Sequence, residues 1–403
     1  MVATDNETSD TSAPMVSDPD IVLEIRDLKT SFYTYEGVVK ALDGISVVLR
    51  REETLALVGE TGCGKSVTAK SILRLVDAPG RVEGGEIIFQ DTTKQGEPVC
   101  MDLLKISEEE MRNIRGAKIA IVFQDPATYP NPVFRIGEQV AEVIMLHEDL
   151  ALDALETKIE RLESSLRQTM DEDTAAQIRK QINHYTSQLD DPPPPTSKDR
   201  KEAAMKRTVK MLELVRMPSP DRVAQLYPHE LSGGMRQRAL IAMALSCNPR
   251  VLICDEATTA LDVTVQAQVL KLLNELKSKM NASIIIITHD LGVVAETCTS
   301  VAVMYAGVVV EYTTSDELFA DPLHPYTSGL MAAIPKLTTK IERLKQIRGS
   351  VPNLISPPTG CRFHPRCDFA TEICSEKRPP REEMKSGHWV ECFHPQGSLA
   401  GTR

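Results

Sequence analysis

Short apolar runs that end at glycine or charged residues recur along the chain. The runs at residues 54–58, 84–89, 118–123 and 250–254 are short, and their composition fits buried strands. Residues 21–57 alternate β-rich runs with turn residues before the first glycine-rich loop. The pattern predicts an α/β fold in which an antiparallel β-layer leads into a parallel core.

A helical pattern replaces these runs in one long segment. Apolar positions there are spaced four, three and four residues apart in two stripes, with a polar break at residues 171–174 between them. The stripes comprise Leu155, Ile159, Leu162, Leu166, Ile178, Ile182, Tyr185 and Leu189. We predict an antiparallel helical hairpin at about residues 151–195, ended by the prolines at 192–195. A solvated decoration and a dedicated docking element both fit this pattern.

Composition narrows the class of protein. A chain of 403 residues with 42% hydrophobic residues can bury a large core and suggests two or more structural units. The apolar runs at residues 283–287 and 300–310 are shorter than the roughly 20 residues of a membrane-spanning helix.

Residues 1–20 are rich in Ser, Thr and Asp, which predicts a disordered tail and not a signal peptide. The net charge of −11 disfavours nonspecific binding to nucleic acid.

The first glycine-rich loop matches the phosphate-binding pattern G-x-x-x-x-G-K-[ST]. Its candidate nucleotide-binding residues are Gly59, Glu60, Thr61, Gly62, Cys63, Gly64, Lys65, Ser66 and Val67. A predicted strand precedes the loop and a predicted helix follows it, a context that places an anion at a helix N-terminus. In this pattern Lys65 pairs with the phosphates and Ser66 ligates Mg²⁺, while Gly62 and Gly64 let the backbone approach closely.

Two more segments strengthen the prediction of nucleotide hydrolysis. Asp255 and Glu256 follow four apolar residues, and burial of two adjacent carboxylates is costly unless a cation offsets their charge. We therefore expect Asp255 to bind Mg²⁺ and Glu256 to act as the general base for the attacking water. The segment Leu231-Ser-Gly-Gly-Met235 precedes an expected helix, whose first N–H groups can face an anion.

These three segments, in this order, resemble the ATP-binding subunits of ABC transporters over about residues 21–321. The resemblance implies a P-loop NTPase core at residues 21–322, with a helical subdomain at about 137–248. It also identifies Gln124 with the Q-loop, a catalytic and Mg²⁺-binding position, and His289 with the switch histidine beside the γ-phosphate. Asp262 corresponds to the D-loop. Tyr35 corresponds to an aromatic residue that stacks on adenine, with a buried aromatic of the β-layer as the alternative.

The resemblance further implies a shared ATP site. In the family, the signature residues act on the P-loop of an opposite subunit, and here they are Ser232, Gly233, Gly234 and Gln237. This chain carries one set of motifs, so a second ATPase subunit is needed, and a paralogue is favoured over a second copy. The implied cofactors are ATP and Mg²⁺.

From Leu323-His-Pro-Tyr-Thr327 onward the chain resembles the ATPases of oligopeptide and dipeptide importers. This implies two transmembrane permeases, an extracytoplasmic peptide-binding protein and a peripheral position on the cytoplasmic face of the cell membrane, with no nucleic acid partner. An importer ATPase for nickel or another solute is the alternative, and a soluble ABC ATPase is a further one. The run Thr128-Tyr-Pro-Asn-Pro132 departs from the usual importer pattern after the Q-loop.

Four late cysteines lie within the expected C-terminal region at residues 323–403. Cys361, Cys367, Cys374 and Cys392 follow the spacing Cys-x₅-Cys-x₆-Cys-x₁₇-Cys. Four thiolates fit a [4Fe–4S] cluster or tetrahedral zinc, and free or disulfide-linked cysteines are the third alternative. The wide gaps, and the presence of clusters in similar importer ATPases, favour the cluster.

Overall fold

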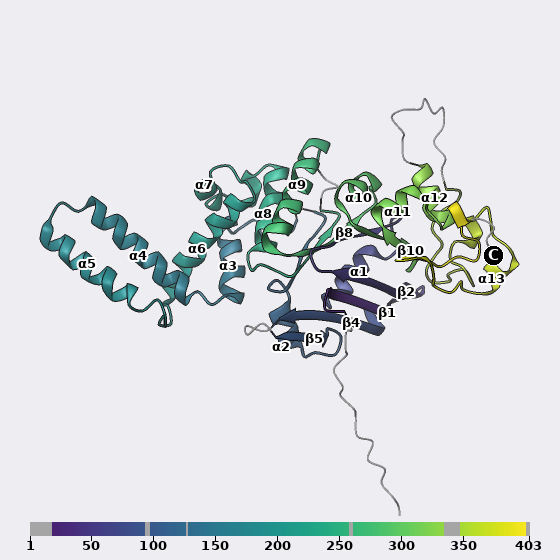
Figure 1. The fold of residues 1–403 in the computed structure, drawn as a ribbon, viewed down its shortest axis with the longest axis horizontal. Helices are drawn as coiled ribbons and strands as arrows, with labels where there is room; N and C mark the ends of the chain where they lie inside the picture. The colour runs from purple at the N-terminus through teal and green to yellow at the C-terminus, as the bar shows by residue number, and fades with distance from the viewer. Residues whose placement is uncertain (1–17, 93–96, 126–127, 258–260, 334–346, 400–403) are drawn as a thin grey trace, which may run out of the picture. The chain divides into compact units, whose positions relative to one another are not determined.

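The computed structural model describes residues 18–92, 97–125, 128–257, 261–333 and 347–399 (Figure 1). The chain divides into two compact units. The first comprises residues 1–112 and 283–403, and the second comprises residues 113–282. Most of the predicted tail lies outside the described residues, but Asp18 forms an ion pair of 2.7 Å with Arg50.

An antiparallel sheet of four strands forms one layer of the first unit, in the order β2-β1-β4-β5. The strands are β1 (Ile21–Thr34), β2 (Gly37–Arg50), β4 (Gly80–Thr92) and β5 (Pro98–Asp102). Leu23 and Ile25 of β1 alternate with more exposed neighbours and are each 1% exposed. This period of two buries one face of that part of the strand.

The second sheet of this unit carries the strand before the glycine-rich loop. Its strands run in the order β11-β12-β10-β9-β3-β8. The three on which the loop depends are β3 (Thr54–Val58), β8 (Ser283–Thr288) and β9 (Ser300–Tyr305). Strand β3 lies between β8 and β9 and is parallel to both. All residues of these three strands are buried, which explains why their sequences are continuous apolar runs.

Short helices and the chain's C-terminal part complete the first unit. The remaining strands are β10 (Val308–Thr314), β11 (Glu382–Lys385) and β12 (His388–Val390). The helices are α1 (Lys65–Ile72), α10 (Leu291–Thr297), α11 (Ser315–Ala320), α12 (Pro325–Ala332) and α13 (Glu372–Glu376). Strand β12 pairs antiparallel with β10. The region from residue 323 onward therefore belongs to the same compact unit as the glycine-rich loop.

A buried carboxylate ties this C-terminal region together. Glu311 of β10 is 1% exposed and accepts hydrogen bonds from the backbone N–H groups of Leu323 at 2.7 Å and His324 at 2.9 Å. The Nε2 atom of His388, on β12, lies 2.7 Å from the same carboxylate. Because these partners come from two segments of the C-terminal region, the one that begins at Leu323 and strand β12, Glu311 links β10 to both of them.

The second unit is mainly helical. Its strands β6 (Ile119–Val122) and β7 (Val251–Asp255) pair in parallel. Helix α2 (Glu108–Ile114) leads into the unit, and the others are α3 (Ile136–His147), α4 (Ala151–Gln168), α5 (Glu172–Thr186), α6 (Ser197–Leu214), α7 (Pro220–Ala224), α8 (Gly233–Leu245) and α9 (Val263–Met280). Helices α4 and α5 run side by side (Figure 1). Among the described residues, no helix has the length and apolar character that crossing a membrane requires.

Candidate nucleotide site

The glycine-rich loop joins β3 to α1, and its backbone requires glycine. Gly64 has φ of 105° and caps α1, and a Cβ atom there would lie 2.7 Å from the carbonyl oxygen of Ala41. A Cβ atom on Gly59 would lie 2.2 Å from the carbonyl oxygen of Met304. Both approaches are too close for any other residue. The close packing of the loop on its own unit therefore explains these two glycines.

Lys65 has its ammonium group turned into the loop. Its Nζ atom donates to the carbonyl oxygen of Gly59 at 2.8 Å and to that of Glu60 at 3.1 Å, and the residue is 5% exposed. A buried cation held by backbone carbonyls can exchange these partners for phosphate oxygens. Together with the N-terminus of α1, the loop has the charge and the N–H groups of an anion site.

The other predicted residues of the first unit divide by exposure. Thr61, Gly62 and Ser66 are exposed, whereas Cys63 is buried, and burial raises the pKa of its thiol. The exposed residues are therefore accessible to a ligand. Val67 is half-buried.

The two residues predicted to contact the base and the γ-phosphate are also exposed. Tyr35 lies in the turn between β1 and β2 and is fully exposed, not buried in the β-layer. His289 follows β8 and is exposed as well. Both side chains are therefore accessible to a ligand, as their predicted roles require.

In the second unit, the structure brings Gln124 and Glu256 together. Gln124 follows β6, Glu256 follows β7, and the two strands are parallel neighbours, so both residues lie at the same edge. The Nε2 atom of Gln124 donates to Oε2 of Glu256 at 2.7 Å. Glu256 has φ of +47°, a conformation that costs free energy for a residue other than glycine. Asp255, directly before it, is 6% exposed.

The signature segment begins helix α8. Ser232 is its N-cap, and its Oγ atom accepts a hydrogen bond of 3.4 Å from the N–H of Met235. Ser232 and Gly233 are exposed, while a Cβ atom on Gly234 would lie 2.8 Å from Val265. Gln237 differs, because it is fully buried and its amide atoms have no hydrogen-bond partner among the described residues. The exposed part of the signature is thus Ser232 and Gly233.

Asp262 has a local role that the sequence motif did not reveal. It is the N-cap of α9, where its Oδ1 atom accepts a hydrogen bond of 3.0 Å from the N–H of Val265. Pro126, two residues after Gln124, and residues 258–260, between Glu256 and Asp262, lie outside the described residues. Tyr129, where the chain departs from the importer pattern, stacks on Phe123 with ring centroids 4.4 Å apart.

Sequence reasoning missed two residues that contact the glycine-rich loop. The N–H of Glu60 donates to the hydroxyl of Tyr326 at 2.9 Å, and the carboxylate of Glu60 pairs with Arg366 at 2.6 Å. Tyr326 belongs to the His-Pro-Tyr-Thr run, and Arg366 lies between the first two of the four late cysteines. Their motifs were visible in the sequence, but their contacts join positions more than 260 residues apart.

The four late cysteines line one small cavity, together with His364 and His394. All four are thiols without a disulfide. Burial raises the pKa of Cys367 to about 11 and that of Cys392 to about 12. Within the described part of the chain, no three His, Cys, Asp or Glu side chains are grouped closely enough to hold a metal ion. The thiol chemistry fits a metal or cluster, but the side chains are not gathered around one point.

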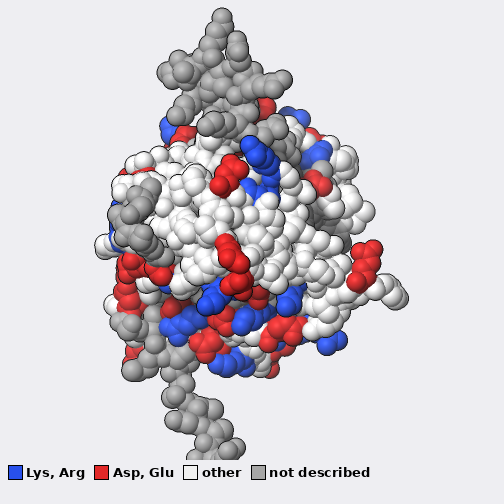
Figure 2. All heavy atoms as spheres, turned by 90° about the vertical axis from the view of Figure 1, so that its right-hand side faces the viewer, with Lys and Arg blue, Asp and Glu red and all other residues white. Residues whose placement is uncertain are grey.

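Charged side chains of both signs are mixed on the face shown in Figure 2. There, Lys and Arg are interspersed with Asp and Glu among the described residues (Figure 2).

Comparisons with known proteins agree with the fold. The model of the ABC transporter family matches residues 42–259, and that of the oligopeptide/dipeptide transporter C-terminal region matches residues 310–374. The dimeric structure of an ATP-binding cassette with bound ADP and phosphate aligns with a TM-score of 0.52 at 19% identity, covering 73% of this chain and 98% of that one. At this identity the likeness shows the fold alone.

Similar sequences cover almost the whole chain. A probable peptide ABC transporter ATP-binding protein of Sinorhizobium fredii is 43% identical, over 94% of this chain and 97% of its own length. Oligopeptide transport ATP-binding proteins of Bacillus subtilis and Escherichia coli are 43% and 41% identical, over 93% and 94% of this chain and 89% and 95% of their own lengths. By family match and by identity over nearly its full length, this chain belongs to the ATP-binding subunits of the ABC transporter family, in the oligopeptide/dipeptide branch.

Proposed function

We propose that this chain hydrolyses ATP to power the import of peptides through partner permeases. The observation that carries the proposal is the glycine-rich loop between β3 and α1, with Lys65 held at its centre, in a chain of the oligopeptide/dipeptide branch. The relatives at 40–43% identity are described as oligopeptide or dipeptide transport ATP-binding proteins. A membrane-bound complex places the chain at the cytoplasmic face of the cell membrane.

In this proposal, the residues of the nucleotide site have separate roles in ATP binding and hydrolysis. Lys65 and the loop N–H groups bind the β- and γ-phosphates, and Tyr35 stacks on the adenine. Ser66, Asp255 and Gln124 are oxygen donors suited to Mg²⁺, which neutralises phosphate charge when bound. Glu256 accepts the proton of the attacking water, and His289 contacts the γ-phosphate. The hydrogen bond from Gln124 to Glu256 supports this role, because it orients the carboxylate.

Substitution of the proposed general base tests this assignment. Glu256→Gln should retain MgATP binding and lose about 10²- to 10⁴-fold in kcat in the assembled transporter, since the amide cannot accept the proton. Glu275→Gln, on α9, is the matched control and should hydrolyse ATP at the wild-type rate. Near-normal hydrolysis by Glu256→Gln would overturn the assignment.

A second ATPase subunit completes the proposed site. Ser232 and Gly233 are exposed at the start of α8, where N–H groups and the helix dipole can face the γ-phosphate bound to another subunit. A paralogue, two permeases and a peptide-binding protein then form the full importer. The isolated chain should hydrolyse ATP slowly, and the assembled complex should restore the rate. A full rate from a dilute monomer would contradict a shared site.

For the four late cysteines we propose a structural [4Fe–4S] cluster, with zinc as the alternative. The cavity shared by Cys361, Cys367, Cys374 and Cys392 supports this proposal, and binding of the metal would require the thiols to lose their protons. Protein purified without oxygen should contain about four irons per chain, and Cys367→Ser should lose them. Stoichiometric zinc without iron would replace the cluster by a zinc site, and absence of both would refute metal binding.

A further inference from the structure

Arg366 forms a two-point ion pair with Glu60, a residue of the phosphate-binding loop. Its Nη1 and Nη2 atoms donate to the two carboxylate oxygens of Glu60 at 2.6 and 3.0 Å. The Arg366 side chain is only 6% exposed and that of Glu60 is 31% exposed. A two-point contact of this kind fixes orientation as well as distance, and partial burial strengthens it.

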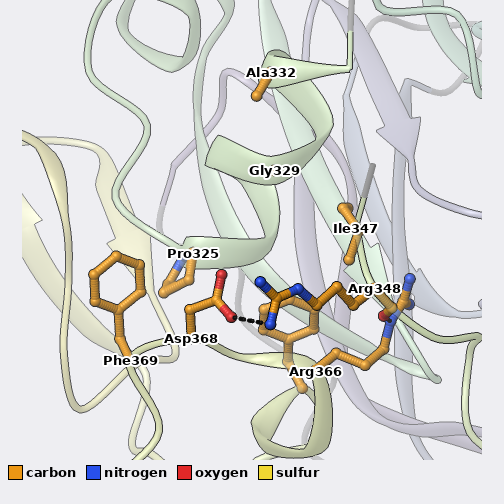
Figure 3. Close-up of a pocket in the computed structure, with 9 residues that line it drawn as sticks. Pro325, Gly329, Ala332, Ile347, Arg348, Arg366, Asp368 and Phe369 are labelled. Atoms are coloured by element: carbon orange, nitrogen blue, oxygen red, sulfur yellow. Dashed lines mark hydrogen bonds and ion pairs between the residues drawn. The ribbon is translucent and has the colours of Figure 1, made fainter. Parts of the chain in front are cut away.

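The guanidinium group is itself held from several sides. Its Nε atom donates to the carbonyl oxygen of Arg348 at 2.7 Å, and Nη1 lies 3.3 Å from the hydroxyl of Tyr305. It also lies over the Tyr305 ring, 5.6 Å from the centroid. Figure 3 shows Arg366 and Arg348 side by side in the wall of a cavity, with Arg348 paired to Asp368. Arg366 is therefore preorganised for its contact with Glu60.

The backbone of Glu60 is held from the same region. Its N–H donates to the hydroxyl of Tyr326 at 2.9 Å, and Tyr326 is fully buried. The Tyr326 ring packs against Phe363 with centroids 5.4 Å apart. Phe363 and Arg366 both belong to the loop between Cys361 and Cys367. That one loop thus holds the side chain of Glu60 directly and supports the tyrosine that holds its backbone.

The neighbouring Arg362 anchors the loop at a second point. It is 8% exposed and forms an ion pair with Asp43 of β2. The backbone N–H of Asp43 donates to the carbonyl oxygen of Gly307 at 2.8 Å, and the N–H of Gly307 donates to that of Cys63 at 3.0 Å. This hydrogen-bonded chain ends in the phosphate-binding loop. Both arginines of the loop between Cys361 and Cys367 therefore face the ATPase core, while its cysteines line the small cavity.

The position of Glu60 matters for nucleotide because Lys65 depends on it. The Nζ atom of Lys65 donates to the carbonyl oxygen of Glu60 at 3.1 Å. A shift of this residue would move both the lysine and the N–H groups that meet the phosphates. An unpaired Glu60 carboxylate would also repel the phosphates, whereas the paired one is neutralised by Arg366.

We propose that Arg366 is a positioning residue for ATP binding, acting through Glu60. The proposal rests on the nucleotide site proposed above, and extends it to the C-terminal region. Through this ion pair, the loop between Cys361 and Cys367 becomes part of the support of the phosphate-binding loop. Any interaction that fixes the positions of the four cysteines therefore also affects the affinity of the chain for MgATP.

A double-mutant cycle on the full chain tests the coupling. The affinity for a fluorescent ATP analogue with Mg²⁺ is measured for wild type, Arg366→Met, Glu60→Gln and the double variant. We expect Arg366→Met to weaken binding about 10- to 100-fold, as loss of a hydrogen-bonded partner of a charged group does. The double variant should bind no worse than Arg366→Met, because both changes remove one interaction. In the assembled transporter, KM should rise more than kcat falls.

Controls separate this effect from general damage. Arg348→Met removes an 86% exposed side chain from the wall of the same cavity and should bind nucleotide as wild type does. If Arg366→Met fails to fold in a thermal melt, Arg366→Lys takes its place in the cycle, since it keeps the charge but loses the two-point contact.

Three outcomes are decisive. Wild-type affinity in the Arg366 variant, or additive losses in the cycle, would overturn the positioning role. A wild-type chain that does not bind MgATP would instead refute the proposed function. Coupled losses with wild-type melting behaviour would support the proposal.

Discussion

The loop between Cys361 and Cys367 and the pair of helices α4 and α5 are attached to their units by different interactions. The loop reaches its unit through side chains that are nearly buried: Arg366 on Glu60, Arg362 on Asp43, and Phe363 against Tyr305 and Tyr326. Of these partners, Glu60 lies in the phosphate-binding loop, and the hydroxyl of Tyr326 accepts a hydrogen bond from the backbone N–H of Glu60. The loop is therefore part of the support of the nucleotide site, although its sequence lacks a regular hydrophobic period.

Helix α4 packs against both α5 and α6 and has two buried residues, Ala154 and Leu155, while ion pairs near the surface add to its contacts. Lys158 pairs with Asp199 of α6 at 2.7 Å and Arg161 pairs with Glu202 at 3.4 Å, and Arg161 is 66% exposed. Exposed pairs of this kind contribute about 0–1 kcal/mol each. Ala175 is the one residue of α5 that is buried among those described. Helix α5 thus has a regular hydrophobic period but little burial, whereas the loop between Cys361 and Cys367 lacks such a period and is nearly buried at Arg366.

The largest expected difference comes from truncating Tyr326 of α12, which packs against Phe363 of the loop between Cys361 and Cys367, and Tyr185 of α5. Tyr326→Ala should lower the free energy of unfolding by about 3–5 kcal/mol, because it leaves a cavity where a fully buried ring packs on Phe363 and Tyr305. Tyr185→Ala, on α5, should cost about 1 kcal/mol or less, since the ring is half-buried. Urea unfolding of the two variants measures both values. Equal losses would contradict the comparison.

A smaller effect should appear as a pH dependence of the unfolding free energy that arises from one buried residue of the C-terminal region, His324. Burial lowers the pKa of His324 from 6.5 to about 4, so the folded state keeps this residue neutral. The unfolded state binds the proton first as the pH falls, and stability is lost progressively between about pH 6.5 and pH 4. The loss should reach about 3 kcal/mol. The negative charge of Glu311 acts on the pKa of His324 in the opposite direction and raises it, but burial is the larger cause.

The fluorescence of Trp389, the only tryptophan of the chain, reports this transition from β12. In His324→Asn the loss of unfolding free energy over this window should be smaller than in wild type by about 3 kcal/mol, because the asparagine does not titrate. Its oxygen can replace the histidine Nδ1 atom as the acceptor for the N–H of Tyr326. His184→Asn on α5, where the histidine is exposed, is the control and should keep the wild-type profile. An unchanged slope in His324→Asn would show that another group is responsible.

The smallest effect is expected from removing the helical pair. Replacement of residues 151–195 by a short Gly/Ser linker should leave the affinity for MgATP within about twofold of wild type, since the packing and ion pairs of α4 outside the pair are made with α6. Fluorescent nucleotide binding measures the affinity, and peptide uptake by the assembled transporter is measured in parallel. Loss of nucleotide binding would show that α4 and α5 support the ATP site. Loss of uptake alone would favour a docking role over a solvated decoration.

Local patterns carried much of the information in this sequence. The buried strand β3, the glycine-rich loop and α1 follow one another within twenty residues, and so hydrophobic runs and glycine positions predict them. The same holds for Asp255 and Glu256 at the end of β7, and for Ser232 before α8. Their chemistry depends on residue type and on short spacing, which are visible without a fold.

Contacts between distant segments were decided by the tertiary structure. Nothing in the sequence pairs Glu60 with Arg366, 306 positions later, or Gln124 with Glu256, 132 positions later. Such pairs form because the chain's sheets and loops bring the segments together, and a pairwise ion contact has no periodic signature. Likewise Gln237 was grouped with the exposed signature residues, yet it is buried, because the helix α8 turns it inward. The sequence by itself determined the family and the chemistry of its motifs, while only tertiary packing decided which residues support the phosphate-binding loop.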